Sequence, residues 1–210
     1  LASVLAIIRG MRPISMLTTA GMTLYSYFYA FEQDSSWPVG ISLSFSISLL
    51  VGSQMLFNDC VDVSIDQRVH PNRPVASGAI SPRFGSQVST LLMCISLVIT
   101  YLASPVMVVY TAIWALICLI YTVWLKYTCA WFANLISATV TASLALTGYL
   151  MGGELRALGF VFFIALISSL MREISKDVED RHGDEGRRFR MLWMIIGTQE
   201  TIRFCLLLLI

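Results

Sequence analysis

The sequence predicts an all-α fold, a polytopic bundle of transmembrane helices, on three observations. Hydrophobic residues make up 57% of the 210 residues. Charged residues make up 13%, where soluble proteins carry about 25%, and the mean hydropathy is +0.75. Apolar stretches of about 20 residues, the length that crosses a bilayer, recur along the chain between short polar segments. We therefore expect an integral, multi-pass membrane protein in which residues 1–210 form a single domain.

Helix-breaking and polar residues mark the ends of seven expected spans. Pro13 suits the opening turn of the first span. Pro82 follows Ser81, which can cap a helix, so it opens the third span. The pair Ser104-Pro105 breaks that span, and the fourth span follows. Gly153 follows the fifth span, and Arg203 is a charge inside the seventh. The expected spans are residues 13–31, 38–58, 82–103, 105–125, 131–151, 158–171 and 191–210.

The first functional signal is a group of carboxylates at the end of the second expected span. Asp59, Asp62 and Asp66 stand at positions i, i+3 and i+7, which lie on one face of a helix. Two carboxylates about 5 Å apart repel by roughly 3 kcal/mol at an effective dielectric constant near 20. Such a group therefore needs protons, basic partners or bound cations. The segment 62–81 is too polar for lipid, and we expect a partly helical loop there.

The second signal repeats this spacing after the sixth expected span. Asp177, Asp180 and Asp184 form another copy of the pattern D-x-x-D-x-x-x-D. Six of the 13 acidic residues of the chain are the aspartates that form the two copies. This makes it a weaker interpretation that the two groups are unrelated, solvated helix ends. Oxygen ligands without His or Cys at ligand spacing favour a hard cation, and Mg²⁺ shared with a substrate phosphate fits best.

Counting spans places both acidic groups at the same face of the membrane. Four spans separate the two groups, and two spans separate the first group from Lys126. The same face receives 12 of the 14 basic residues, which the positive-inside rule assigns to the cytoplasm. Arg73, Lys126 and Lys176 can therefore meet a diphosphate that Mg²⁺ joins to the carboxylates. The apolar bundle around such a site implies a hydrophobic tail, so we expect a prenyl diphosphate.

These motifs resemble those of a known family. Asn58 and the first three aspartates, followed by the run R-P-V-A-S-G-A-I-S at residues 73–81, are similar to the signature of the UbiA-type intramembrane prenyltransferases. Tyr121, Lys126 and Asn134 look like the next motif of that family. The run K-D-V-E-D-x-x-G-D at residues 176–184 looks like its second aspartate motif. The wording of this last motif is most similar to digeranylgeranylglyceryl-phosphate-synthase-like and homogentisate-type members.

The resemblance implies nine transmembrane helices around a central cavity that opens to lipid. About seven are expected here, so the chain is expected to continue beyond residue 210. The implied reaction is the Mg²⁺-dependent transfer of a prenyl group from a polyprenyl diphosphate to a lipophilic or aromatic acceptor, in contact with membrane lipid and without nucleic acid. The implied catalytic and metal-binding residues are Asp59, Asp62, Asp66, Asp177, Asp180 and Asp184. The implied substrate-binding residues are Ser15, Asn58, Arg68, Arg73, Tyr121, Lys126, Asn134 and Lys176.

Two departures from the family pattern concern the acceptor. Ser15 stands where many members have Asn in the acceptor pocket, and M-L-W at residues 191–193 replaces T-L-P. We therefore expect a glycerol-phosphate lipid or a homogentisate-like phenol rather than 4-hydroxybenzoate. Two alternatives stay open: a UbiA-like terpene synthase that cyclises the prenyl diphosphate, and a polytopic transporter whose carboxylates bind cations.

Overall fold

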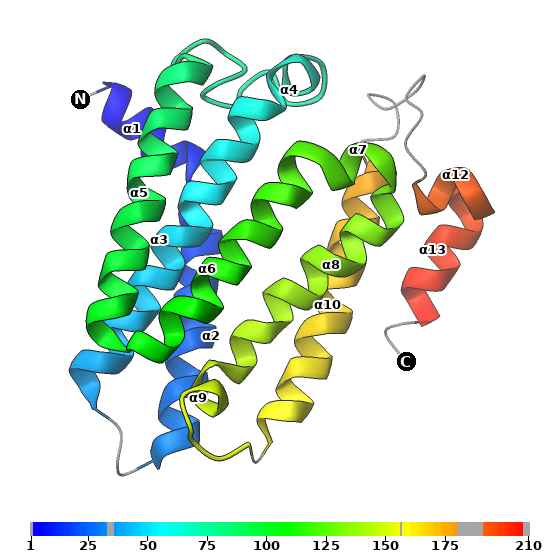
Figure 1. Cartoon of the computed structure of the whole chain (residues 1–210). Helices are drawn as coiled ribbons and strands as arrows, with labels where there is room; N and C mark the ends of the chain where they lie inside the picture. The colour runs from blue at the N-terminus through cyan, green and yellow to red at the C-terminus, as the bar shows by residue number, and fades with distance from the viewer. Residues whose placement is uncertain (1, 33–35, 156, 180–190, 208–210) are drawn as a thin grey trace.

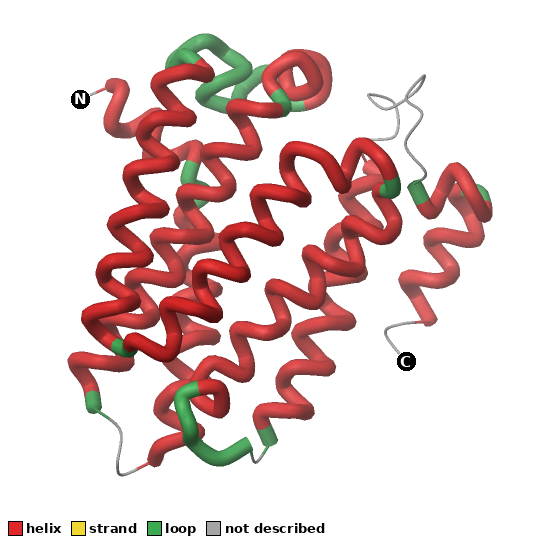
Figure 2. The backbone as a smooth tube through the Cα atoms, in the orientation of Figure 1, coloured by secondary structure: helices red, strands yellow, loops and turns green. Residues whose placement is uncertain are grey.

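The structure is a computed structural model that describes residues 2–32, 36–155, 157–179 and 191–207. The described residues form helices joined by turns, and they include no strand (Figure 2), which confirms the all-α prediction. In these ranges, five helices are long and apolar enough to cross a membrane. They match the second to sixth expected spans and are Trp37–Val61, Pro82–Ala103, Pro105–Thr128, Ala130–Leu150 and Leu158–Glu179.

The long helices run beside one another as a bundle, with their ends at two opposite faces (Figure 1). The helical elements in chain order are α1 (Ala2–Gly10), α2 (Pro13–Phe31), α3 (Trp37–Val61), α4 (Val63–Val69), α5 (Pro82–Ala103), α6 (Pro105–Ile120), the π-helical turn η2 (Tyr121–Leu125), α7 (Lys126–Thr128), α8 (Ala130–Ala142), the 3₁₀ turn η3 (Ser143–Leu146), α9 (Thr147–Leu150), α10 (Leu158–Glu179), α12 (Leu192–Ile196) and α13 (Thr198–Leu207).

Helix α3 is the centre of the bundle. In its most apolar 18-residue window 72% of the residues are buried, whereas the figure for α5 is 17%. The buried face of α3 carries hydroxyl groups that bond to the neighbouring helix. The Oγ atom of Ser46 lies 2.9 Å from Oγ1 of Thr100, and Ser96 donates to the Ser46 carbonyl at 2.7 Å. Such small polar residues let membrane helices approach closely and bond to each other.

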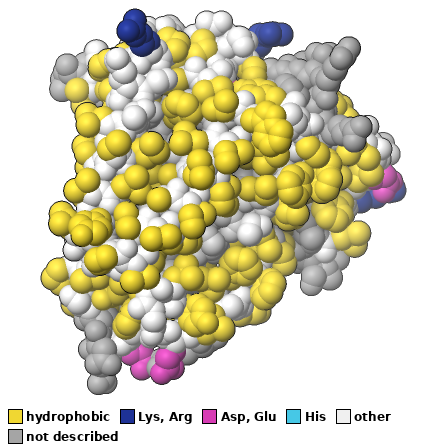
Figure 3. Space-filling model, viewed as in Figure 1, with side chains coloured by type: hydrophobic (Ala, Val, Ile, Leu, Met, Phe, Trp, Pro, Cys, Tyr) yellow, Lys and Arg dark blue, Asp and Glu magenta, His cyan; other side chains and the backbone are white. Residues whose placement is uncertain are grey.

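The outer helices turn their apolar side chains outward. On α5 and α6, Leu91, Leu102, Val106 and Val109 are all at least 60% exposed. Figure 3 shows a wide hydrophobic surface around the middle of the molecule, with the coloured basic and acidic groups mostly at its edges. An exposed apolar surface of this extent requires a hydrocarbon environment. The chain is therefore an integral membrane protein, as the sequence predicts.

The first and seventh expected spans differ from the other five. Helix α2 has the expected bounds, Pro13–Phe31, but its Ser, Thr and Tyr residues keep it outside the five apolar spans. The seventh expected span is not one continuous helix. It divides at Gly197, whose φ of +86° interrupts the α-helical path between α12 and α13. Arg203 pairs with Glu200 at 2.5 Å within α13.

Helix α9 packs very closely against α2. Ser26 donates to the carbonyl of Ala145 at 2.8 Å and accepts from the backbone N–H of Gly148 at 3.0 Å. A Cβ atom on Gly148 would lie 2.2 Å from the Ser26 carbonyl oxygen, so only glycine fits here. This contact fixes α2 to the fifth span at the end of the bundle away from the acidic residues (Figure 1).

Candidate active site

The first acidic group lies where α3 passes into α4. Helix α3 ends at Val61 and α4 begins at Val63, and Asp62 between them has φ −88° and ψ 12°. The Asp62 carbonyl accepts from the N–H groups of Ile65 and Asp66, both at 2.8 Å, which starts the new helix at once. The three carboxylates therefore lie at the same end of the bundle, but on two consecutive helices joined at Asp62. The expected arrangement on one face assumed a single continuous helix.

Asp59 and Asp66 are held by arginines from separate segments. Arg12 donates to Asp59 at 2.6 Å, and Arg73 donates to Asp66 at 2.6 Å while lying 3.6 Å from Asp59. The two carboxylates are only 1% and 2% exposed. Buried charges require such partners, because an unpaired carboxylate away from water is very costly.

The position of Arg12 depends on an unusual backbone conformation. Arg12 joins α1 to α2 with φ 55° and ψ 74°, in the left-handed region that residues with a side chain rarely occupy. Such a conformation costs of the order of 1–3 kcal/mol and concentrates at functional sites. The ion pair with Asp59 offsets this cost.

Asp62 has three side-chain donors. Lys126 donates to one carboxylate oxygen at 2.6 Å, Tyr127 to the other at 2.5 Å, and Asn58 to the first at 2.9 Å. Lys126 also donates to the amide oxygen of Asn58 at 2.8 Å. The Lys126 ammonium thus links α3 to the fourth span.

A π-helical turn brings Tyr121 and Lys126 to the same side of the fourth span. Residues five apart in an α-helix point in different directions, about 140° apart. Here the backbone N–H of Lys126 bonds to the carbonyl of Tyr121, which closes an i→i+5 turn. The extra residue turns both side chains toward the same pocket. Single π-helical turns of this kind often occur at functional sites.

Asp177 of the second acidic group lies in the last turn of α10. Helix α10 extends eight residues beyond the expected end at residue 171, so Lys176 and Asp177 are still helical. Asn134 on α8 donates to Asp177 at 2.6 Å, as expected for two motifs that meet. Asp180 and Asp184 lie outside the described residues.

A pocket of about 100 Å³ lies between the α3–α4 junction and the end of α10. It brings together nine of the predicted site residues. They are Asn58, Asp62, Asp66, Arg73, Tyr121, Lys126, Asn134, Lys176 and Asp177. We call this space the carboxylate pocket.

Three predicted residues do not line the carboxylate pocket. Arg68 is exposed on α4 and donates to the Ser64 carbonyl of its own helix. Ser15 is half-buried in the first turn of α2 and lines neither this pocket nor the neighbouring cavity. Asp59 pairs with Arg12 and is not among the residues that line the pocket. Arg68 and Ser15 therefore have no contact with the pocket that would support a substrate role.

Sequence reasoning missed three residues that the structure places at or next to the site. Arg12 and Tyr127 bond to the aspartates, and His70 lines the carboxylate pocket. Tyr127 directly follows Lys126 in the motif, which is a signal that could have identified it. The partner of Arg12 is 47 residues away along the chain, so nothing local indicates their pairing.

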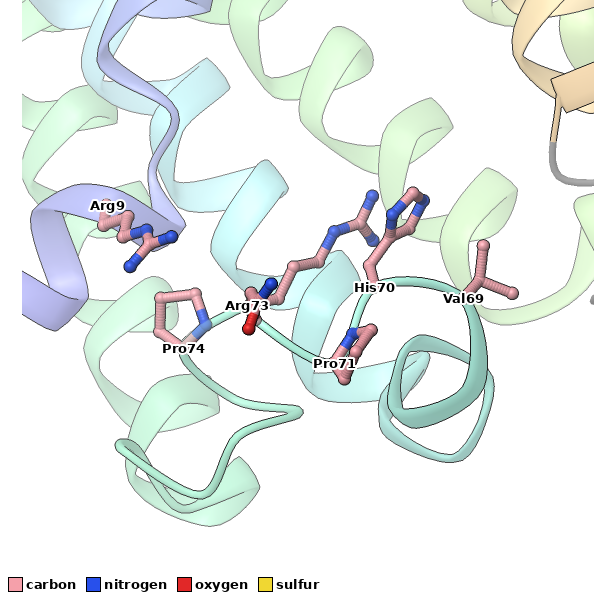
Figure 4. Close-up of a pocket in the computed structure, with 7 residues that line it drawn as sticks. Arg9, Val69, His70, Pro71, Arg73 and Pro74 are labelled. Carbon is pink, nitrogen blue, oxygen red and sulfur yellow. The ribbon is translucent and has the colours of Figure 1, made fainter.

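A second cavity of about 270 Å³ adjoins the carboxylate pocket and shares Val69, His70 and Arg73 with it. Figure 4 shows this cavity between the end of α1 and the loop that follows α4, with Arg9 reaching across from α1. We call it the arginine cavity.

The donor set of the carboxylate pocket fits a hard cation such as Mg²⁺. Asp62, Asp66 and Asp177 supply carboxylate oxygens, and the buried Oδ2 atom of Asp66 has no hydrogen-bond partner among the described residues. Within the described ranges, no three His, Cys, Asp or Glu side chains gather at metal-binding spacing. Instead, basic side chains pair with each of the first three aspartates.

Comparisons with known proteins agree with this geometry. Residues 18–210 match the UbiA prenyltransferase family. Digeranylgeranylglyceryl phosphate synthase from Natronomonas pharaonis is 30% identical over 193 residues, which cover 91% of this chain and 69% of that protein. The enzymes of the same name from Methanosphaera stadtmanae and Methanoculleus marisnigri are 30% and 28% identical, and the matches span 60% and 71% of their lengths.

Solved structures share the fold. A structure described as that of digeranylgeranylglyceryl phosphate synthase in membranes has a TM-score of 0.76 at 23% identity, covering 99% of this chain and 74% of that one. A UbiA homologue from Archaeoglobus fulgidus, bound to GPP and Mg²⁺, has a TM-score of 0.75 at 15% identity, covering 97% and 73%. The predicted resemblance and the predicted enzyme class are confirmed: this chain belongs to the UbiA prenyltransferase family.

Proposed function

We propose that residues 1–210 form one domain that binds a prenyl diphosphate with Mg²⁺ and transfers its prenyl group to a lipophilic acceptor. One observation carries this proposal. Asp62 and Asp66 from the α3–α4 junction line the same pocket as Lys176 and Asp177 from α10. A pocket that combines carboxylates and ammonium groups at the edge of an apolar bundle suits a metal-bound diphosphate with a hydrophobic tail.

Asp62, Asp66 and Asp177 would hold the metal, with Asp180 and Asp184 as further expected ligands. Bound Mg²⁺ supplies charge neutralisation for the diphosphate as it leaves. Lys126 and Arg73 are now bonded to aspartates at 2.6 Å. When a diphosphate enters, these two cations can exchange a carboxylate oxygen for a phosphate oxygen, and Lys176 can add a third positive charge.

The bond between carbon one of the prenyl group and the diphosphate oxygen breaks, and both bonding electrons leave with the diphosphate. The resulting allylic cation takes an electron pair from the acceptor, which then loses a proton. Any water present would react with the cation, so the apolar walls must exclude it. Tyr121 and Met191 contribute to these walls.

The preferred acceptor class is a glycerol-phosphate lipid. Three similar proteins are named digeranylgeranylglyceryl phosphate synthase, and this fits the wording of the second aspartate motif. We also infer that the end of the bundle with the carboxylate pocket faces the cytoplasm, because basic residues are concentrated at that end. The dark blue groups at the upper edge of Figure 3 and the magenta groups at its lower edge follow this pattern.

The test is transfer by the purified full-length protein, reconstituted in nanodiscs. It is incubated with Mg²⁺, radiolabelled prenyl diphosphates of several lengths, and a panel comprising a prenylated glycerol phosphate, homogentisate and 4-hydroxybenzoate. We expect labelled product with the glycerol phosphate lipid and no cyclised product without an acceptor. A cyclic terpene in the absence of any acceptor would favour the synthase alternative. Faster transfer to 4-hydroxybenzoate than to the other two acceptors would refute the proposed acceptor class.

A further inference from the structure

The arginine cavity lies beside the carboxylate pocket and differs from it in charge. Among the described residues, its polar lining consists of Arg9, His70, Asn72 and Arg73 and includes no carboxylate. Val69, Pro71 and Pro74 form the apolar part of its wall. A cavity whose described polar lining consists of cationic, imidazole and amide groups favours an anion.

The two arginines approach this cavity from different segments. Figure 4 shows Arg9 reaching from the end of α1 toward Pro74, while the Arg73 side chain extends toward His70. No carboxylate among the described residues lies within ion-pair distance of Arg9, whereas Arg73 is bonded to Asp66. Arg9 is also exposed. Its guanidinium is therefore available to a ligand, and guanidinium groups suit the paired oxygens of a phosphate.

The size and position of the cavity restrict the ligand further. Its volume of about 270 Å³ lies just below the range for small-molecule pockets, roughly 300–1,000 Å³. This space suits a head group and not a whole lipid. Because Val69, His70 and Arg73 line both spaces, a group bound in the arginine cavity lies next to the place where the prenyl cation would form.

We propose that the arginine cavity binds the phosphate of the acceptor, with Arg9 and Arg73 as its main partners and His70 and Asn72 as further hydrogen-bond donors. This inference rests on the proposed function and adds the residues that recognise the acceptor. Arg73 then serves both substrates, because it also bonds to Asp66 in the carboxylate pocket. The phosphate fixes the acceptor so that its nucleophilic group reaches across the shared wall.

The first experiment measures binding without any reaction. Inorganic phosphate is titrated against the full-length protein in neutral phosphatidylcholine nanodiscs, with the thermal unfolding midpoint as the readout. We expect a saturable rise for the wild type and an affinity at least about tenfold weaker for Arg9→Gln, because one charge-assisted hydrogen bond is lost. Arg83→Gln, an exposed arginine outside both cavities, is the matched control and should bind like the wild type. Equal affinity in Arg9→Gln and the wild type would overturn the proposal.

The lipid composition of the nanodisc distinguishes a site for the acceptor phosphate from a site for the phosphate of bulk lipid head groups. In nanodiscs of anionic phosphatidylglycerol, the acceptor assignment predicts an unchanged phosphate affinity. Loss of phosphate binding only in the anionic nanodiscs would show that bulk lipid head groups fill the cavity, and this would overturn the acceptor assignment.

The second experiment measures transfer to a prenylated glycerol phosphate and to the same lipid without its phosphate. Arg9→Gln should raise KM for the phosphorylated acceptor at least about tenfold, with kcat and the KM for the prenyl diphosphate within about twofold of wild type. The lipid without its phosphate should be a poor acceptor for both proteins alike.

If Arg9→Gln does not fold, Asn72→Ala takes its place with the same expected pattern. An equal loss with both acceptors would overturn phosphate recognition. Phosphate binding that depends on Arg9, without transfer to any glycerol phosphate lipid, would instead refute the proposed function and leave the anion site standing.

Discussion

Replacing Lys126 by methionine should separate the structural role of this lysine from its role toward substrate. Its ammonium lies 2.6 Å from Asp62 and 2.8 Å from Asn58, and the Lys126 and Asp62 side chains are 14% and 12% exposed. Removing one member of a buried pair costs about 3–5 kcal/mol. Because Tyr127 and Asn58 still donate to Asp62, we expect the lower end, about 3 kcal/mol of unfolding free energy.

The assay is a double-mutant cycle with Asp62→Asn, followed by chemical unfolding in mixed micelles. The double variant has no unpaired charge, so it should be about 2 kcal/mol more stable than the sum of the single losses predicts. Lys126→Met should also lower kcat/KM by about 10²–10³, the usual effect of losing one electrostatic donor, and the double variant should not recover activity. Lys176→Met is the control for stability only, because Lys176 lines the same pocket but is exposed, and its loss should leave the unfolding free energy unchanged. Additive stabilities within about 0.5 kcal/mol would refute the assigned ion pair.

Three further predictions concern the hydroxyl donor, the metal and the helix contact. Tyr127→Phe removes the hydroxyl that donates to Asp62 at 2.5 Å and should cost about 1.5–3 kcal/mol of unfolding free energy; no change in the unfolding midpoint would contradict this. EDTA should abolish transfer and excess Mg²⁺ should restore it, whereas transfer that persists in EDTA would exclude the metal role. Gly148→Ala should destabilise the protein by more than about 2 kcal/mol, because the new Cβ would clash with the Ser26 carbonyl, while Gly21→Ala, with open space around it, should not.

The spans and the meeting of the two motifs could be predicted because they depend on local features. Long apolar runs between prolines and glycines define the helices, and counting the spans brings Asp62 and Asp177 to one end. The structure has both residues in one pocket. The expectation fails in the last segment, where Gly197 takes a positive φ and divides the helix. Hydropathy does not register this kind of backbone conformation.

The side-chain contacts depend on tertiary structure that a motif does not contain. The pairing of Arg12 with Asp59 requires α1, the left-handed turn at Arg12 and the end of α3 to meet. The direction of Lys126 depends on a π-helical turn, for which the sequence has no local signal. Arg68 lies in the predicted motif region, yet its place on α4 directs it to solvent. The spacing of motifs along the chain therefore indicates which segments meet, whereas the backbone geometry decides which side chains come into contact.

The most direct test of the central claim is whether the α3–α4 junction and α10 form one diphosphate site. Binding of a non-reactive prenyl thiodiphosphate to the full-length protein is measured by calorimetry, with and without Mg²⁺, for the wild type, Asp62→Ala, Asp177→Ala and the double variant. We predict tight binding only with Mg²⁺, a large loss in each single variant, and a double variant that is little worse than either single one. Losses that multiply in the double variant, or binding that does not depend on Mg²⁺, would contradict a single shared site.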